Sequence, residues 1–206
     1  MLKKLSLFSL VLGLFLLFVV GWPVLQYQIW LVTEYHESVN LLSPTSNQVL
    51  GASTLGDFSS GNFGDSVSQK PYEKFTISVP KIKLNNETVI VDSNNFDQQL
   101  AHLPGTALPG EKGNVFITGH SSVFLWQLGN KKPIFNNLNT LKKGDEIKVD
   151  AFGQNFVYAV QGVKVVNPTD VYVINPPGGD GRYLTLMTCV PPGFNTERLV
   201  VLAKLK

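Results

Sequence analysis

The 206-residue sequence contains a single cysteine, Cys189, and lacks several patterns that would place it in familiar protein classes. It has no CxxC pair and no cluster of histidine and cysteine at the spacing of zinc ligands. It has no internal repeat. Lysine and arginine total 17 against 15 aspartates and glutamates, a net charge of +2, and no basic stripe is interleaved with aromatic residues. Nucleic acid is therefore not expected as a partner.

Charge is also absent from residues 5–25, LSLFSLVLGLFLLFVVGWPVL. About 20 apolar residues suffice for a helix to cross a bilayer. Lys3 and Lys4 precede this run and the first charge after it is Glu34, so the positive-inside bias predicts a cytoplasmic N-terminus at residues 1–4. The alternative is a cleaved signal peptide, but the run exceeds a usual apolar signal core and no small-x-small cleavage site follows. We expect a single-pass anchor in the plasma membrane with the rest of the chain outside the cell.

The chain after the apolar run changes composition twice. Residues 42–70 are rich in serine, glycine and asparagine, and such a segment buries too little apolar surface to offset its ordering entropy. We interpret residues 26–71 as a flexible extracellular stalk. Residues 72–206 are of a size that supports one domain with its own core.

The pattern of that domain is mostly typical of strands. Short runs rich in valine, isoleucine, threonine and aromatics are separated by glycine, proline, asparagine and aspartate. These runs are FTISVPKIKL, ETVIVD, GNVFITGH, DEIKVDAF, NFVYAVQGVKVV, VYVIN, RYLTLMTC and RLVVLAKL. Only DQQLAHL and PIFNNLNTLKKG favour brief helical turns. The sequence predicts a mainly β fold, a closed antiparallel eight-stranded barrel with short helices, preceded by the transmembrane helix.

The lone cysteine lies at the end of one predicted strand, and Arg198 begins the next. If the two strands pair, Cys189 lies at the rim of the sheet beside a permanent positive charge. That surrounding favours the thiolate and can stabilise a developing oxyanion. An odd cysteine outside a membrane suggests a reactive thiol or an intermolecular disulfide. The alternative is a buried cysteine that acts as a small hydrophobe.

A cysteine nucleophile needs a partner that moves protons, most often histidine. His36 lies in the predicted stalk and His102 beside a Pro-Gly turn. His120 ends a predicted strand directly after Gly119, so its side chain is free to project over a groove. His120 is therefore the candidate general acid and base.

These motifs resemble those of the sortases. The resemblance rests on NVFITGH ending at His120, on TLMTC at residues 185–189, and on Arg198 in ERLVV. Further similar phrases are SVPKIKL, HLPGTALPGEKGN, LKKGDEIKV and VNPTDVYVINPPGGD. The resemblance covers residues 75–206, and the apolar run followed by a stalk is similar to the layout of membrane-bound sortases.

The resemblance implies a cysteine transpeptidase. Such an enzyme cleaves an LPxTG-like sorting signal on a secreted protein through a thioester, then transfers the protein to an amine on a peptidoglycan precursor or a pilin lysine. Carried over to this chain, Cys189 is the nucleophile, His120 the general acid/base, and Arg198 the residue that holds the substrate backbone and the oxyanion. Thr188 is expected to help orient the substrate or the intermediate. The loop between Asn167 and Arg182 is expected to form one wall of the peptide groove.

No metal or other cofactor is expected. Some class A sortases bind calcium, but the nearby acidic residues lack the density of a calcium loop, so solvated surface charge is the better interpretation. These residues are Asp145, Glu146, Asp170 and Asp180. LPGTA at residues 103–107 is similar to a sorting signal, but no separate apolar anchor and basic tail follow it. It is interpreted as a turn within the domain.

Three alternatives stay open to different degrees. A papain-like peptidase needs the cysteine before the histidine, and the order here is the reverse. An L,D-transpeptidase-like enzyme would place histidine and glycine directly before the cysteine, where Met187 and Thr188 stand. A non-catalytic, sortase-like binding module would not need a cysteine, a histidine and an arginine together.

Overall fold

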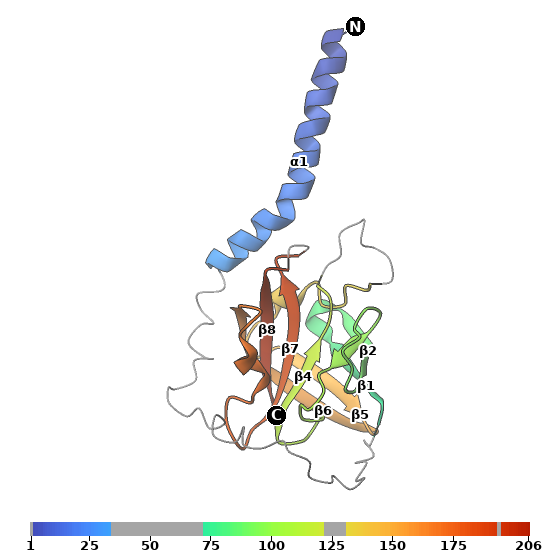
Figure 1. Ribbon diagram of the computed structural model, residues 1–206, viewed down its shortest axis with the longest axis vertical. Coiled ribbons are helices and arrows are strands. Elements are labelled where there is room, and N and C mark those ends of the chain that lie inside the picture. The colour runs from blue at the N-terminus through green and yellow to red at the C-terminus, as the bar shows by residue number, and fades with distance from the viewer. Residues whose placement is uncertain (1, 34–71, 122–130, 193–194) are drawn as a thin grey trace, which may run out of the picture.

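The computed structural model describes residues 2–33, 72–121, 131–192 and 195–206 (Figure 1). Helix α1 (Leu2–Thr33) continues past residue 25, where the predicted span ends. Within the described ranges, no helix is both long and apolar enough to cross a membrane. The predicted membrane span therefore stays a prediction, and the predicted stalk from residue 34 to 71 lies outside the described residues.

Eight strands form a closed barrel in the order β1-β2-β3-β4-β7-β8-β6-β5. The strands are β1 (Lys74–Val79), β2 (Leu84–Ile90), β3 (Leu100–His102), β4 (Gly113–Thr118), β5 (Glu146–Ala151), β6 (Gln154–Val166), β7 (Arg182–Val190) and β8 (Glu197–Leu205). Short 3-10 helices lie between them: η3 (Pro80–Ile82), η5 (Leu138–Thr140) and η6 (Val171–Ile174). The predicted mainly β, closed eight-stranded barrel is confirmed.

The prediction that the barrel is wholly antiparallel is wrong. Strands β2 and β3 pair in parallel, and so do β4 and β7. Parallel neighbours need a crossover connection, and here β5 and β6 lie between β4 and β7 in the chain. Alternation of apolar and polar residues shows which face of a strand is buried but not the direction of its neighbour, so the sequence pattern could not reveal this.

Two local assignments also differ from the sequence prediction. VYVIN is not a strand but contains η6, where Val171 is 68% exposed. DQQLAHL is not helical, because its last residues form β3 against β2 and β4. The second predicted helical stretch, PIFNNLNTLKKG, contains only the single turn η5. The predicted strand number is right because the missed strand β3 replaces the false one.

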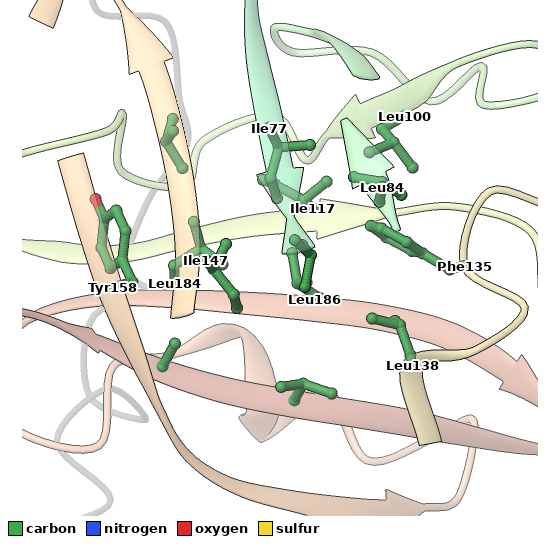
Figure 2. Packing of buried hydrophobic residues seen from close by; sticks show 14 of the residues in the cluster. Ile77, Leu84, Leu100, Ile117, Phe135, Leu138, Ile147, Tyr158, Leu184 and Leu186 are labelled. Atoms are coloured by element: carbon green, nitrogen blue, oxygen red, sulfur yellow. The ribbon is translucent and has the colours of Figure 1, made fainter. Parts of the chain in front are cut away.

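The barrel interior is filled by apolar side chains from alternate strand positions (Figure 2). On β7, Leu184, Leu186 and Val190 belong to this core. On β8, Leu199 and Val201 do the same. Each fully buried side chain of this size contributes about 1.5–3 kcal/mol to stability. Because successive side chains point to opposite faces of a strand, the intervening residues of β7 and β8 face outward.

Candidate active site

Cys189 lies between the two residues that the sequence predicts as its partners. Strands β4 and β7 pair in parallel with one unbroken register, from Gly113 opposite Arg182 to Thr118 opposite Met187. Continuing this register by two residues places His120 beside Cys189. On the other side of β7, Cys189 is the direct partner of Arg198 in β8. The strand order β4-β7-β8, visible in Figure 1, therefore brings all three together at one end of the sheet.

The three side chains share the outer face of the barrel. Cys189 alternates with core residues of β7, and Arg198 alternates with those of β8, so neither points into the core. Directly opposed residues of an antiparallel pair have Cβ atoms about 4.5–5.5 Å apart. Cys189 is a half-buried free thiol. The thiol is thus neither an inert core residue nor half of a disulfide within the chain, and a cation lies next to it.

The backbone that carries His120 is fixed to β7 by three hydrogen bonds. The Gly119 N–H donates to the Met187 carbonyl at 3.3 Å. The Thr188 hydroxyl donates to the Gly119 carbonyl at 2.8 Å, and the Ser121 hydroxyl donates to the Cys189 carbonyl at 2.5 Å. The histidine and the cysteine are therefore held by the same short piece of backbone.

Two residues of this region act through packing. An ideal Cβ at Gly119 would lie 2.5 Å from Cδ2 of Leu100 and 3.0 Å from Cδ2 of Phe135, so the position needs glycine. Thr188 is only 2% exposed, and its hydroxyl is occupied by Gly119. The expected contact of Thr188 with a substrate is not supported by this placement. Its side chain instead supports the backbone that presents His120.

The His120 imidazole contacts two residues that sequence reasoning missed. Its Nε2 lies 3.2 Å from Oδ1 of Asp97, and the Phe96 ring centroid lies 4.6 Å from that of the imidazole. Its backbone carbonyl accepts a hydrogen bond from the Phe135 N–H at 2.8 Å. No sequence signal pointed to Asp97, because it lies in the segment that the pattern assigned to a helical turn.

Arg198 is half-buried and keeps donors for a ligand. Its Nη1 donates to the carbonyls of Asn195 and Glu197, each at 3.0 Å. A guanidinium has five N–H donors in a fixed planar arrangement. Among the described residues, those on Nε and Nη2 have no partner. A fixed cation with free donors beside a thiol can bind a peptide carbonyl and the negative charge that develops on it.

The loop between β6 and β7 is tied to the outer face of the sheet by Asn114. Its side-chain amide donates to the carbonyls of Val173 and Ile174, at 3.3 and 2.9 Å. Its Oδ1 accepts a hydrogen bond from the Thr185 hydroxyl at 2.9 Å, which fixes the orientation of the amide. Asn114 is 3% exposed and Thr185 is fully buried. This buried pair fixes the position of η6 on the strands that carry the cysteine and the histidine.

We expect Asn114→Ala to loosen this loop. The substitution removes both bonds to the η6 backbone and leaves the Thr185 hydroxyl without its acceptor. Losing buried bonds of this kind costs about 1–2 kcal/mol, so amide hydrogen exchange in η6 should accelerate about tenfold. Native-state exchange measured by mass spectrometry tests this, with the exposed Asn155→Ala as control. Unchanged exchange in η6 would show that the pair does not hold the loop.

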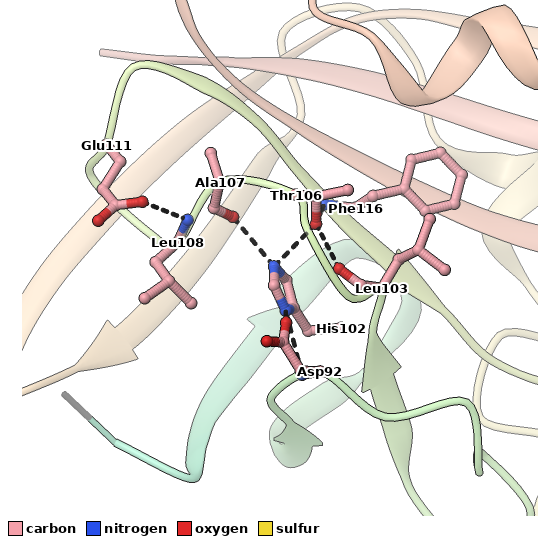
Figure 3. A network of polar contacts seen from close by, with 8 residues as sticks. All are labelled: Asp92, His102, Leu103, Thr106, Ala107, Leu108, Glu111 and Phe116. Atoms are coloured by element: carbon pink, nitrogen blue, oxygen red, sulfur yellow. Dashed lines mark hydrogen bonds and ion pairs between the residues drawn. The ribbon is translucent and has the colours of Figure 1, made fainter. Parts of the chain in front are cut away.

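The other described histidine has a structural role. His102 is fully buried, and Figure 3 shows a polar contact on each ring nitrogen. Nδ1 lies 3.1 Å from Oδ1 of Asp92, while Nε2 lies 3.0 Å from the Ala107 carbonyl and 2.9 Å from the Thr106 hydroxyl. These contacts fix the Pro-Gly turn at residues 103–107, as expected of a turn within the domain. His36 lies outside the described residues.

The acidic residues considered for calcium are engaged in turns and ion pairs. Carboxylates of Asp145 and Asp170 each accept a backbone N–H three residues earlier, at 2.8 Å. Glu146 pairs with Lys206 at 2.5 Å, and the 94%-exposed Asp180 pairs with Lys112 at 3.1 Å. Within the described part of the chain, no three His, Cys, Asp or Glu residues are arranged to hold a metal ion.

Comparison with known proteins agrees with this geometry. The family model described as Sortase domain matches residues 77–206. Sortase A of Bacillus anthracis is 32% identical over 134 residues, which are 63% of this chain and 58% of the relative. Sortase SrtE1 of Streptomyces coelicolor is 33% identical over 108 residues, 48% of this chain and 29% of the relative. The matches thus span from under a third to under three fifths of these curated relatives.

Solved structures show the same fold. Sortase A from Corynebacterium diphtheriae, in a lid mutant, superposes with a TM-score of 0.58 at 29% identity, covering 66% of this chain and 70% of that one. A Clostridium perfringens Sortase D5 transpeptidase superposes with a TM-score of 0.56, also at 29% identity, covering 65% and 79%. On the evidence of the barrel, of the residues gathered at its rim and of these matches, the chain belongs to the sortase family.

Proposed function

We propose that this chain is a cysteine transpeptidase that attaches secreted proteins to an amine on the cell surface. The observation that carries the proposal is the strand register. It places Cys189 beside Arg198 on one side and beside His120 on the other, all on the outer face of one sheet. A nucleophile, a proton carrier and an oxyanion donor are the groups that acyl transfer requires.

The first half of the reaction is acylation of the cysteine. The Cys189 thiolate attacks the scissile carbonyl of the bound peptide, and the Arg198 guanidinium binds the oxygen as it becomes negative. As the tetrahedral intermediate collapses, the C–N bond breaks and the His120 imidazolium gives its proton to the leaving amine. The products are a thioester on Cys189, a free amine and neutral His120.

The second half reverses these roles. An acceptor amine attacks the thioester carbonyl while neutral His120 takes a proton from the attacking nitrogen. Arg198 again binds the oxyanion. Collapse of the second intermediate forms the new amide bond and releases the Cys189 thiolate beside the His120 imidazolium. The free enzyme is thus restored with no net consumption of protons.

The proposed substrates are secreted proteins with LPxTG-like signals, and the acceptor is the amine of a peptidoglycan precursor or a pilin lysine. Family membership supports both. The structure of Sortase C from Streptococcus pneumoniae, 27% identical with a TM-score of 0.57, is described in terms of pilin substrate specificity. The loop fixed by Asn114 runs beside Cys189 on the outer face and offers a wall for an extended peptide.

A transfer assay tests this function. The full chain in detergent is incubated with a library of LPxTG-like peptides, with and without triglycine, and the products are identified by mass spectrometry. We expect cleavage after the threonine and a triglycine-ligated product that grows with triglycine concentration. Binding of peptides without cleavage would favour the alternative, a non-catalytic binding module.

We also propose that α1 attaches the chain to the plasma membrane, with the barrel outside the cell. The support is the uncharged run at residues 5–25 and the large apolar side chains that α1 exposes, such as Phe8 at 66% and Leu17 at 73%. Carbonate extraction of cell membranes tests attachment, and protease treatment of intact cells tests sidedness. Release of the full chain by carbonate would contradict an integral anchor.

A further inference from the structure

The carboxylate of Asp97 is the feature of the site that the proposed mechanism leaves without a role. Its Oδ1 lies 3.2 Å from Nε2 of His120. The His120 side chain is 17% exposed and that of Asp97 is 52% exposed. An ionised carboxylate only accepts hydrogen bonds, so at this distance Nε2 must carry the hydrogen. The contact therefore selects one of the two neutral tautomers of the imidazole.

Asp97 is held in place from both sides of its backbone. Its N–H donates to Oδ1 of Asn95 at 3.2 Å, and the Asn95 N–H donates to the Ser93 hydroxyl at 3.1 Å. Its carbonyl accepts a hydrogen bond from the Lys132 N–H at 2.6 Å. The neighbouring Phe96 ring packs against the imidazole. The carboxylate thus belongs to a fixed loop rather than to a freely moving surface side chain.

We propose that Asp97 is a positioning residue for His120: it holds the hydrogen on Nε2 and leaves Nδ1 as the atom that exchanges protons with the substrate. This inference rests on the proposed function. In acylation the proton on Nδ1 passes to the leaving amine, and in transfer Nδ1 takes one from the attacking amine. Asp97 stays ionised throughout. Because it is half exposed, its contribution lies in orienting the ring more than in the strength of the ion pair.

The test compares Asp97→Asn and Asp97→Glu with the wild-type full chain in detergent. The ¹⁵N shifts of the His120 ring are measured above the pH at which the ring becomes neutral, because they report the tautomer directly. We expect the Nε2–H form to dominate in the wild type and in Asp97→Glu. Asp97→Asn, whose amide can also donate, should populate the Nδ1–H form. The matched control is Asp150→Asn, the same loss of charge at an exposed position of β5.

Kinetics with a cleaved peptide supply the second measurement. We expect kcat of Asp97→Asn to fall about tenfold, a part of the factor of 10²–10⁴ that general acid–base catalysis supplies, with KM changed less than twofold. Asp97→Glu should recover at least half of that loss on a logarithmic scale. The same tautomer and the same kcat in Asp97→Asn as in the wild type would overturn the inference.

The two proposals fail separately. If the wild type cleaves no peptide, the proposed function fails, while the ring shifts still decide whether Asp97 sets the tautomer. If the wild type is active but a mixture of tautomers is present with Asp97 in place, the positioning role fails and the transpeptidase proposal stands.

Discussion

Replacing Cys189 with alanine is expected to abolish both cleavage and transfer of LPxTG-like peptides. The sequence holds no second thiol that could take over. Without a nucleophile, the carbonyl would have to be attacked directly by water or by the amine, and removal of a covalent nucleophile of this kind lowers kcat by about 10⁴-fold or more. The measurement is kcat/KM for a cleaved peptide, compared at equal enzyme concentration.

The same variant separates an enzyme from a binding module. Cys189 is half-buried and contributes little to the core, so Cys189→Ala should keep the circular dichroism and melting temperature of the wild type. Peptide binding, followed by fluorescence anisotropy, should persist in the variant. Residual cleavage within tenfold of the wild-type rate would mean that the nucleophile lies elsewhere.

Replacing His120 with alanine is expected to lower kcat by about 10²–10⁴-fold, with a much smaller effect on KM. The imidazole is needed to protonate the leaving amine and to deprotonate the acceptor, while the peptide is held mainly by other groups. Single-turnover kinetics would show whether acylation, transfer or both are slowed. Both should be, because the same group acts in each half of the reaction.

His102→Ala is the matched histidine control. This imidazole is fully buried and contacts Asp92, Thr106 and the Ala107 carbonyl. Its loss leaves buried polar groups without partners, each at about 1–3 kcal/mol, so the expected effect is a lower free energy of unfolding. If His120→Ala instead resembled His102→Ala, with lost stability and little change in the kcat of the folded fraction, His120 would not be the proton carrier.

The candidate site was predictable because its signals are local. Cys189 and Arg198 occupy adjacent strand ends, and the two strands are consecutive in the chain, so their pairing follows from the alternation pattern. His120 was predictable from its motif, but its place beside Cys189 depends on the parallel pairing of β4 with β7. That pairing closes across two other strands, and no local pattern encodes it.

The features that escaped prediction depend on contacts between distant segments. Strand β3 is three residues long and is a strand only because β2 and β4 flank it. VYVIN has the composition of a strand, but its backbone is tied to Asn114 instead of to a neighbouring strand. Asp97 reaches His120 because Lys132, far along the chain, holds its carbonyl. In each case tertiary contacts override local propensity.

The most direct test of the account is to trap the acyl-enzyme. The full chain is mixed with an LPxTG-like peptide in the absence of an amine, quenched in acid, and digested for tandem mass spectrometry. The account predicts the peptide acyl group on the sulfur of Cys189, and its transfer to triglycine when the amine is added before the quench. A thiol that stays unacylated during measurable peptide cleavage would contradict the central claim.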